Sequence, residues 1–278
     1  MFGHRIIQAA HADRPRWLLA TGLAPLSRTV LETLRASGVQ TLNYLTDDPW
    51  NPVHRAGWFL NALPGYDHVF SPRQAVLEDL RRAGVRAAHY LPFAYAPALH
   101  YPDPPTAAER ARWTCDAVFV GGADRDRVPW ILPPLRAGLT VRLYGGYWDR
   151  WRATRPWTLG FADPAAYRHA VGAAAVALCL VRRANRDGHA MRTFELAAMR
   201  ACLLAEATAE HQALLGPEGQ AALYCHTPTE MLEKLRWLLA RPRERVRLAD
   251  AAYRLVTQGH HTYADRLAAM VEMDAGRS

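Results

Sequence analysis

The segment from residue 185 to residue 195 carries the residue types best suited to chemistry. It places two carboxylates, Asp187 and Glu195, on either side of Arg192, where a loop passes into a helix-compatible stretch. Free amides at a helix start attract phosphate, arginine can clamp phosphate through two bonds, and carboxylates accept hydrogen bonds from sugar hydroxyls. The junction therefore suits a sugar attached to a diphosphate, although an ordinary N-terminal charge and a helix-dipole partner explain the two carboxylates equally well.

A second acidic pair, Asp47 and Asp48, follows an apolar run and precedes Pro49. If sugar transfer inverts the configuration, a carboxylate or imidazole must take the proton of the acceptor hydroxyl. We interpret the pair as the candidate base or acceptor contact. An aspartate-capped turn before the proline explains the same residues equally well, and a retaining reaction needs no such base.

One histidine and three tryptophans lie near these segments. His189 is inside the junction, where a donor contact and a structural role are equally well supported. Trp148, Trp151 and Trp157 follow a glycine pair. They could stack on a sugar or base, but core packing is the commoner fate of tryptophan and is favoured.

Composition narrows the function classes. The formal net charge is +8, and Lys234 is the only lysine, so arginine supplies almost all of the positive charge. The arginines are dispersed and often adjacent to acids, which disfavours a nucleic-acid stripe. The four cysteines are scattered without zinc-ligand spacing, which argues against a metal site and a disulfide framework. Signatures of serine hydrolases, metalloproteases, P-loop NTPases and dinucleotide oxidoreductases do not occur.

Short apolar runs alternate with amphipathic stretches throughout the chain. This alternation is typical of parallel sheets covered by helices, so we predict an α/β fold of two Rossmann-like, doubly wound domains. A proline-rich interval ending near residue 105 separates domains at 1–105 and 106–278, and the last helix could pack back on the first domain. The predicted strands are 16–21, 41–45, 67–70, 87–91, 116–122, 140–146, 174–180, 202–205 and 222–224. The predicted helices include 27–37, 72–83, 228–239, 243–257 and 262–273.

From about Arg14 to Met273 the chain resembles CgeB-like glycosyltransferases, which are bacterial nucleotide-sugar-dependent enzymes of the two-domain GT-B architecture. The motifs that carry the resemblance occur in the expected order. They are Thr46-Asp47-Asp48-Pro49, Tyr66-Asp67-His68-Val69-Phe70, Tyr90-Leu91-Pro92-Phe93, Arg192-Thr193-Phe194-Glu195, Leu204-Ala205-Glu206, Glu210-His211, Glu230-Met231-Leu232-Glu233-Lys234 and His261-Thr262-Tyr263.

The resemblance implies that the second domain binds the sugar nucleotide. Glu195 would hold the ribose, Asp187 would lie near the donor sugar, and Arg192 with the amides around Thr193 would meet the diphosphate. Further donor contacts are implied at Gly121, Gly122, Arg125 and Arg183.

Two departures from the family pattern affect these expectations. Met199-Arg200-Ala201 replaces small, glycine-rich residues, so packing or donor choice there could differ. The chain also starts later than family members do, so either the N-terminal domain is a shortened variant, or the start is missing, or another chain supplies the piece. The N-terminal sheet would lack a first strand and expose an edge to which a partner chain could bind.

We therefore expect a cytoplasmic glycosyltransferase, compatible with a peripheral position at the inner membrane face, that needs no metal or other cofactor. It would transfer a sugar from a nucleoside-diphosphate sugar to a glycan, lipid-linked or protein acceptor. No apolar run approaches the ~20 residues of a membrane span. The alternative is a catalytically silent GT-B module that binds a nucleotide or a partner subunit. Nucleic-acid binding is the least supported interpretation.

Overall fold

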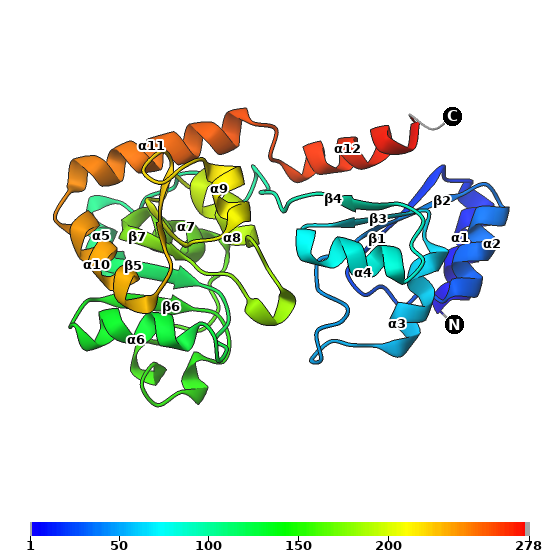
Figure 1. The fold of residues 1–278 in the computed structure, drawn as a ribbon. Coiled ribbons are helices and arrows are strands. Elements are labelled where there is room, and N and C mark those ends of the chain that lie inside the picture. The colour runs from blue at the N-terminus through cyan, green and yellow to red at the C-terminus, as the bar shows by residue number, and fades with distance from the viewer. Residues whose placement is uncertain (1, 276–278) are drawn as a thin grey trace. The chain divides into compact units, whose positions relative to one another are not determined.

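The computed structural model describes residues 2–275, which form two compact units (Figure 1). Unit 1 contains the chain up to Pro92, the short segment Arg183–Asp187 and the chain from Leu267 on. Unit 2 contains Phe93–Arg182 and Gly188–Arg266. The contacts thus divide the chain between Pro92 and Phe93, ahead of residue 105, and assign an internal segment of five residues to unit 1.

Unit 1 is built on a four-stranded parallel sheet in which the strands follow one another in chain order. Its strands are β1 (Trp17–Thr21), β2 (Gln40–Tyr44), β3 (His68–Ser71) and β4 (Ala88–Tyr90). Its helices before β4 are α1 (Phe2–Asp13), α2 (Arg28–Ala36), α3 (Gly57–Ala62) and α4 (Leu77–Arg82), with single 3-10 turns at Leu63–Gly65 and Gln74–Val76.

Local sequence explains where α2 begins and ends. The Ser27 hydroxyl accepts a hydrogen bond from the Val30 amide, which satisfies one of the free amides of the first turn. Leu31 and Leu34 lie one turn apart and are buried against the sheet. Gly38 then adopts φ +83° and ends the helix, a left-handed conformation that glycine reaches without the steric strain of a Cβ.

Unit 2 is built on a five-stranded parallel sheet of order β6-β5-β7-β8-β9. Its strands are β5 (Cys115–Val120), β6 (Val141–Tyr144), β7 (Ala174–Cys179), β8 (Leu203–Glu206) and β9 (Ala222–Cys225). Its helices are α5 (Ala107–Trp113), α6 (Val128–Arg136), α7 (Pro164–Ala173), α8 (Met191–Ala198), α9 (Ala209–Leu215), α10 (Pro228–Leu239) and α11 (Pro242–Gln258), with 3-10 turns at Trp148–Arg150 and Arg155–Trp157.

The strand order of unit 2 reverses at β5. After β5 the chain moves to β6 on one side and then returns to β7 on the other. The loops that follow β5 and β7 therefore diverge from neighbouring strand ends, which is where open α/β sheets bind ligands. This switch point is the position that the fold offers for a functional site in unit 2.

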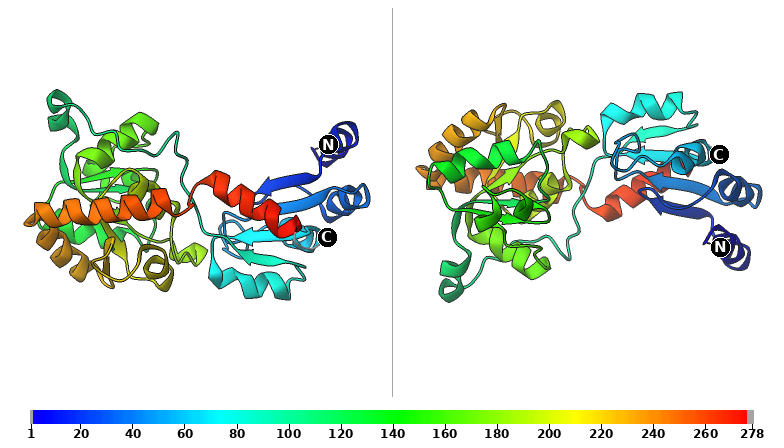
Figure 2. Two further views of the ribbon diagram at one scale, coloured as in Figure 1. Left: turned by 90° about the horizontal axis from the view of Figure 1, so that it is seen from above. Right: turned by 90° about the horizontal axis from the view of Figure 1, so that it is seen from below.

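The last helix, α12 (Tyr263–Ala275), begins in unit 2 and continues in unit 1 from Leu267. Figures 1 and 2 show its later part beside the sheet of unit 1, on the face opposite to α4. Met270 is buried and is among the core residues of this part. None of the helices in the described part of the chain has both the length and the hydropathy that a membrane span requires.

The predicted α/β class with two Rossmann-like sheets is confirmed, and all nine predicted strands occur in the predicted order. The helical stretch predicted over residues 72–83 occurs as the 3-10 turn Gln74–Val76, which runs directly into α4 (Leu77–Arg82). No side chain caps the start of either. Without a cap, the first turn tightens to i,i+3 bonds.

Candidate functional site

Arg127 joins the two loops at the switch point of unit 2. Its buried guanidinium donates to the carbonyl of Gly122 after β5 and to the carbonyls of Leu180 and Val181 after β7, each at 3.2 Å. These bonds fix the loops relative to each other because one rigid, planar group serves both. The sequence prediction missed Arg127 and chose Arg125, which is exposed in the same loop.

The glycines at this edge differ in how strictly they are required. A side chain at Gly121 would meet the Phe119 ring at 3.0 Å, whereas one at Gly122 would make only ordinary contacts, the nearest at 3.5 Å to the Arg182 guanidinium. Gly145, after β6, has φ +122°, and a Cβ there would lie 2.5 Å from the Gly121 carbonyl oxygen. The closest backbone approach is therefore between Gly121 and Gly145.

Arg192 and Glu195 form an ion pair within the first turns of α8. The Arg192 Nε also donates to the Val120 carbonyl at 2.9 Å, which places its guanidinium at the end of β5 beside Gly121. Glu195 is buried, and its Oε2 accepts a further hydrogen bond from the Tyr167 hydroxyl at 3.1 Å. The structure thus brings together the predicted cation, the predicted ribose contact and the predicted glycine turn.

Tyr167 and His100 were not predicted, although both border Glu195. His100 Nε2 lies 3.8 Å from Glu195 Oε1. Desolvation, followed by the nearby Arg192 and Arg168, lowers the pKa of His100 to about 4, so it is neutral at pH 7. Burial raises the pKa of the Tyr167 hydroxyl, which therefore stays a hydrogen-bond donor.

Thr193 and His189 are held by protein groups. Thr193 is buried, its hydroxyl accepts from the Ala190 amide at 3.2 Å, and its own amide donates to the Ala190 carbonyl. His189 is also buried, with Nδ1 2.7 Å from Glu210 and Nε2 accepting from the Phe93 amide at 3.1 Å. These bonds favour structural roles for both residues.

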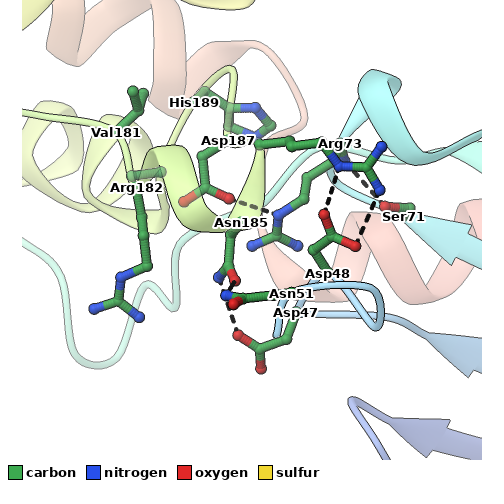
Figure 3. Close-up of polar contacts among 12 residues, drawn as sticks. Asp47, Asp48, Asn51, Ser71, Arg73, Val181, Arg182, Asn185, Asp187 and His189 are labelled. Carbon is green, nitrogen blue, oxygen red and sulfur yellow. Dashed lines mark hydrogen bonds and ion pairs between the residues drawn. The ribbon is translucent and has the colours of Figure 1, made fainter. Parts of the chain in front are cut away.

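The predicted residues Asp47, Asp48 and Asp187 lie in unit 1, which includes the segment Arg183–Asp187. Asp187 forms an ion pair of 2.5 Å with Arg73, which follows β3, and both side chains are almost completely buried. Figure 3 shows the Asn185 side chain pointing toward Asn51 and Asp47, to which its hydrogen bonds measure 2.7 and 3.2 Å. Asp187 and the acidic pair after β2 therefore belong to one polar cluster of unit 1.

Asp48 and Asp47 differ within this cluster. Asp48 is 1% exposed and accepts from the Trp50 amide at 2.9 Å, as expected for an aspartate-capped turn. It also accepts two bonds from Arg186, at 2.6 and 3.1 Å. The hydrogen bond to Asp48 is the main cause that raises the pKa of Arg186 above its ordinary value, with Asp79 contributing. Asp47 is partly exposed.

Two further predicted residues are exposed. Arg125 is exposed in the loop after β5, and Arg183 is exposed at the start of the 3-10 turn Arg183–Asn185. Trp148 is fully buried and donates to the Gly121 carbonyl at 2.8 Å, in agreement with a packing role. Trp157 is more exposed, at 38%.

Comparison with known proteins gives a family and a fold. Residues 125–272, more than half of the chain, match the family described as glycosyl transferase-like. No curated protein matches the chain. HepE from Anabaena, solved in complex with UDP-glucose, has a TM-score of 0.68 and 12% identity, over 99% of this chain and 82% of that one. Sucrose-phosphate synthase from Thermosynechococcus elongatus has a TM-score of 0.66 and 16% identity, over 99% of this chain and 77% of that one.

Proposed function

This chain belongs to the glycosyl transferase-like family, and we propose that it transfers a sugar from a nucleoside-diphosphate sugar to a glycan, lipid-linked or protein acceptor. The observation that carries the proposal is the position of Arg192 and Glu195 at the end of β5, beside the Gly121 turn and at the switch point of the sheet. The order of the short motifs supports a CgeB-like member of the family.

The arginines at the end of β5 have the chemistry that a nucleoside-diphosphate sugar requires. Negative charge develops on the departing diphosphate, and preorganised cations stabilise it more in a partly desolvated site than in water. Arg192 and the neighbouring Arg182, which lies 3.5 Å from where a Gly122 Cβ would be, supply such charge. Because arginine supplies the charge, the proposed reaction needs no metal ion. HepE was solved with UDP-glucose, UDP, and UDP with glucose, which supports a nucleotide-sugar donor for this chain as well.

On the acceptor side we assign the base to Asp47 in preference to Asp48. Both oxygens of Asp48 accept hydrogen bonds from Arg186, and the residue is buried. Asp47 is partly exposed, and its described side-chain bond is a single one from the Asn185 amide. A base must be able to reach the hydroxyl that it deprotonates. Asp187, in its ion pair with Arg73, would act by fixing the Arg183–Asp187 segment.

Calorimetric titration with UDP-, GDP-, ADP- and dTDP-sugars tests the proposal, followed by an assay for nucleoside-diphosphate release with and without acceptors. We expect binding of one donor class and turnover, both strongly reduced in Glu195→Gln and Glu195→Ala. Glu233→Ala, at an exposed glutamate of α10, is the matched control and should behave as the unmodified chain. Binding without hydrolysis or transfer would favour the silent module, and a failure to bind any donor would remove support for both.

A further inference from the structure

Exposed apolar side chains gather in the loop of unit 2 that follows β6, residues 147–161, which we call the 147–161 loop. β6 is an edge strand of its sheet, and Figure 1 shows the 3-10 turns of the loop in green beyond α6. The exposed apolar residues of the loop are Tyr147 (54%), Trp157 (38%), Leu159 (48%) and Phe161 (86%). Single exposed apolar residues are ordinary on a protein surface, but several together indicate an interaction surface.

The backbone of the 147–161 loop is held in place by hydrogen bonds. The Leu159 amide donates to the Leu143 carbonyl of β6 at 2.9 Å. The Gly145 amide donates to the Gly160 carbonyl at 2.7 Å. Within the loop, the buried Thr154 hydroxyl donates to a backbone carbonyl at 2.7 Å. An apolar surface on an ordered backbone loses little conformational entropy when it binds, which favours docking.

The loop also carries exposed positive charge. Arg150, Arg152 and Arg155 are exposed, and the single acidic residue of the loop is Asp149. The Arg150 guanidinium lies 4.2 Å from the centroid of the Tyr147 ring, and Arg155 Nε donates to the Asp149 carbonyl at 2.9 Å. These partners are neutral, and within the described part of the chain none of the three arginines forms an ion pair. Their charge is therefore available to an anionic surface.

The combination of apolar side chains and arginines fits the boundary between water and an anionic lipid layer. Tryptophan, phenylalanine and leucine form the apolar face of segments that lie in this boundary, and each arginine near an anionic lipid surface strengthens binding by ~5-fold. A single-stranded nucleic acid would instead stack its bases on aromatic rings along a basic groove. Leu159 has no ring for stacking, and Arg150 covers the Tyr147 ring, so a lipid surface is favoured.

We propose that the 147–161 loop docks unit 2 on an anionic lipid surface. Trp157, Leu159 and Phe161 enter the interfacial layer, and the arginines of the loop meet the phosphates of the headgroups. This interaction goes beyond the proposed function, because it requires neither a donor nor sugar transfer. Its consequence for the acceptor, a lipid-linked one in preference to a soluble glycan or a protein, rests on the proposed function.

Co-sedimentation of the complete chain with lipid vesicles, in the absence of nucleotide, tests the proposal. Vesicles of phosphatidylcholine mixed with phosphatidylglycerol are compared with vesicles of phosphatidylcholine alone, at low salt and at about 0.5 M NaCl. We expect the chain to bind the anionic vesicles ~10-fold or more tightly than the neutral ones. Most of this preference should be lost at high salt, because salt screens the attraction between the arginines and the headgroups.

Two variants separate the apolar and the charged contributions. Trp157→Ser/Phe161→Ser should lower the affinity for anionic vesicles by ~10-fold or more, because two rings no longer leave water. Arg150→Gln/Arg152→Gln/Arg155→Gln should lower this affinity by ~10-fold to ~100-fold and reduce its salt dependence. Thermal melting checks that both variants are folded.

The matched control is Trp237→Ser/Arg241→Gln, at a tryptophan of α10 that is 39% exposed and lies 4.4 Å from an arginine. It should bind vesicles as the unmodified chain does. Equal binding to anionic and neutral vesicles, no binding to either, or an equal loss in the control would overturn the proposal. Binding of a single-stranded oligonucleotide that depends on the loop, without binding to vesicles, would also overturn it. Vesicle binding by a chain that binds no nucleotide-sugar donor would support this inference and overturn the proposed function.

Discussion

Arg192 and Glu195 are three residues apart on α8 and bind each other. The two groups predicted to contact the diphosphate and the ribose of a donor are therefore also partners of each other. Such a pair keeps a buried carboxylate compensated, and it is exchanged when a ligand offers better partners to both. The cost of separating the pair lowers the net affinity for the donor but keeps the site ordered.

Replacement of Arg192 by glutamine should reduce turnover by ~100-fold to ~1000-fold, because a cation that stabilises the leaving diphosphate is lost. Affinity for the nucleoside diphosphate should fall more than affinity for the nucleoside. Steady-state kinetics and calorimetry measure these changes. The matched control is Arg136→Gln, at an exposed arginine of α6. A variant with unchanged affinity for the diphosphate would contradict the assignment.

The two aspartates after β2 should have different roles, with Asp47 acting in the reaction and Asp48 in stability. If Asp47 is the base, Asp47→Asn should lower kcat by ~100-fold or more with little effect on stability. Asp48→Asn should lower the free energy of unfolding by ~1–3 kcal/mol, because Arg186 loses the negative charge and one of the two oxygens to which it donates. Urea unfolding and initial-rate measurements on both variants distinguish the roles. A stable, fully active Asp47→Asn would assign the reaction to a retaining course or to another base.

Replacing only one partner of the buried ion pair of Arg73 and Asp187 should lower the free energy of unfolding strongly. Asp187→Asn leaves the Arg73 charge in a nearly inaccessible position, so the free energy of unfolding should fall by ~3–5 kcal/mol. The double variant Arg73→Met/Asp187→Leu should recover part of that loss, because it removes both charges together. Urea unfolding of Arg73→Met, of Asp187→Leu and of the double variant gives the interaction energy between the two residues. Additive losses would show that the pair contributes no specific interaction.

His211 predicts a dependence of stability on pH. Desolvation is the main cause that lowers its pKa to about 4 in the folded chain, from 6.5. The unfolded chain therefore binds a proton at higher pH than the folded chain, so the contribution is complete above pH 6.5 and is lost as pH falls toward 4. The loss should approach ~3 kcal/mol.

Urea unfolding of the unmodified chain between pH 4 and pH 7 measures this dependence. His211→Asn should reduce the dependence over the same interval and leave the part that is due to His100, whose pKa is also lowered to about 4. His4→Asn, at an exposed histidine of α1, should leave the dependence unchanged. A slope that is identical in the unmodified chain and in His211→Asn would assign the pH dependence to other groups.

The sequence predicts elements better than it predicts the site, for a physical reason. Each strand is recognised from its own apolar run, so all nine were found without knowledge of their neighbours. The order β6-β5-β7-β8-β9 depends on pairing between distant segments and was not predicted. Arg127 is one arginine among many in the sequence, and its three carbonyl acceptors become neighbours only when β5 and β7 pair.

The same argument applies to individual site residues. The spacing of Arg192 and Glu195 places them on one helical face, so their ion pair could have been predicted from sequence alone. Tyr167 lies 28 residues before Glu195 and carries no local signal of its contact. The ion pair of Asp187 with Arg73 spans 114 residues and requires the Arg183–Asp187 segment to join unit 1, which no local pattern indicates.

The five residues Arg183–Asp187 belong to unit 1 although the chain on both sides of them belongs to unit 2, and this limits where the chain can be cut into stable fragments. A fragment that ends at Pro92 would contain Arg73 and Asp48 without the carboxylate and guanidinium that neutralise them. Expression of that fragment alone should therefore give an unstable product, and co-expression with the remainder of the chain should rescue it. Because the ion pairs of Asp187 with Arg73 and of Arg186 with Asp48 join segments on either side of residue 92, a single proteolytic cut there should leave the two pieces associated.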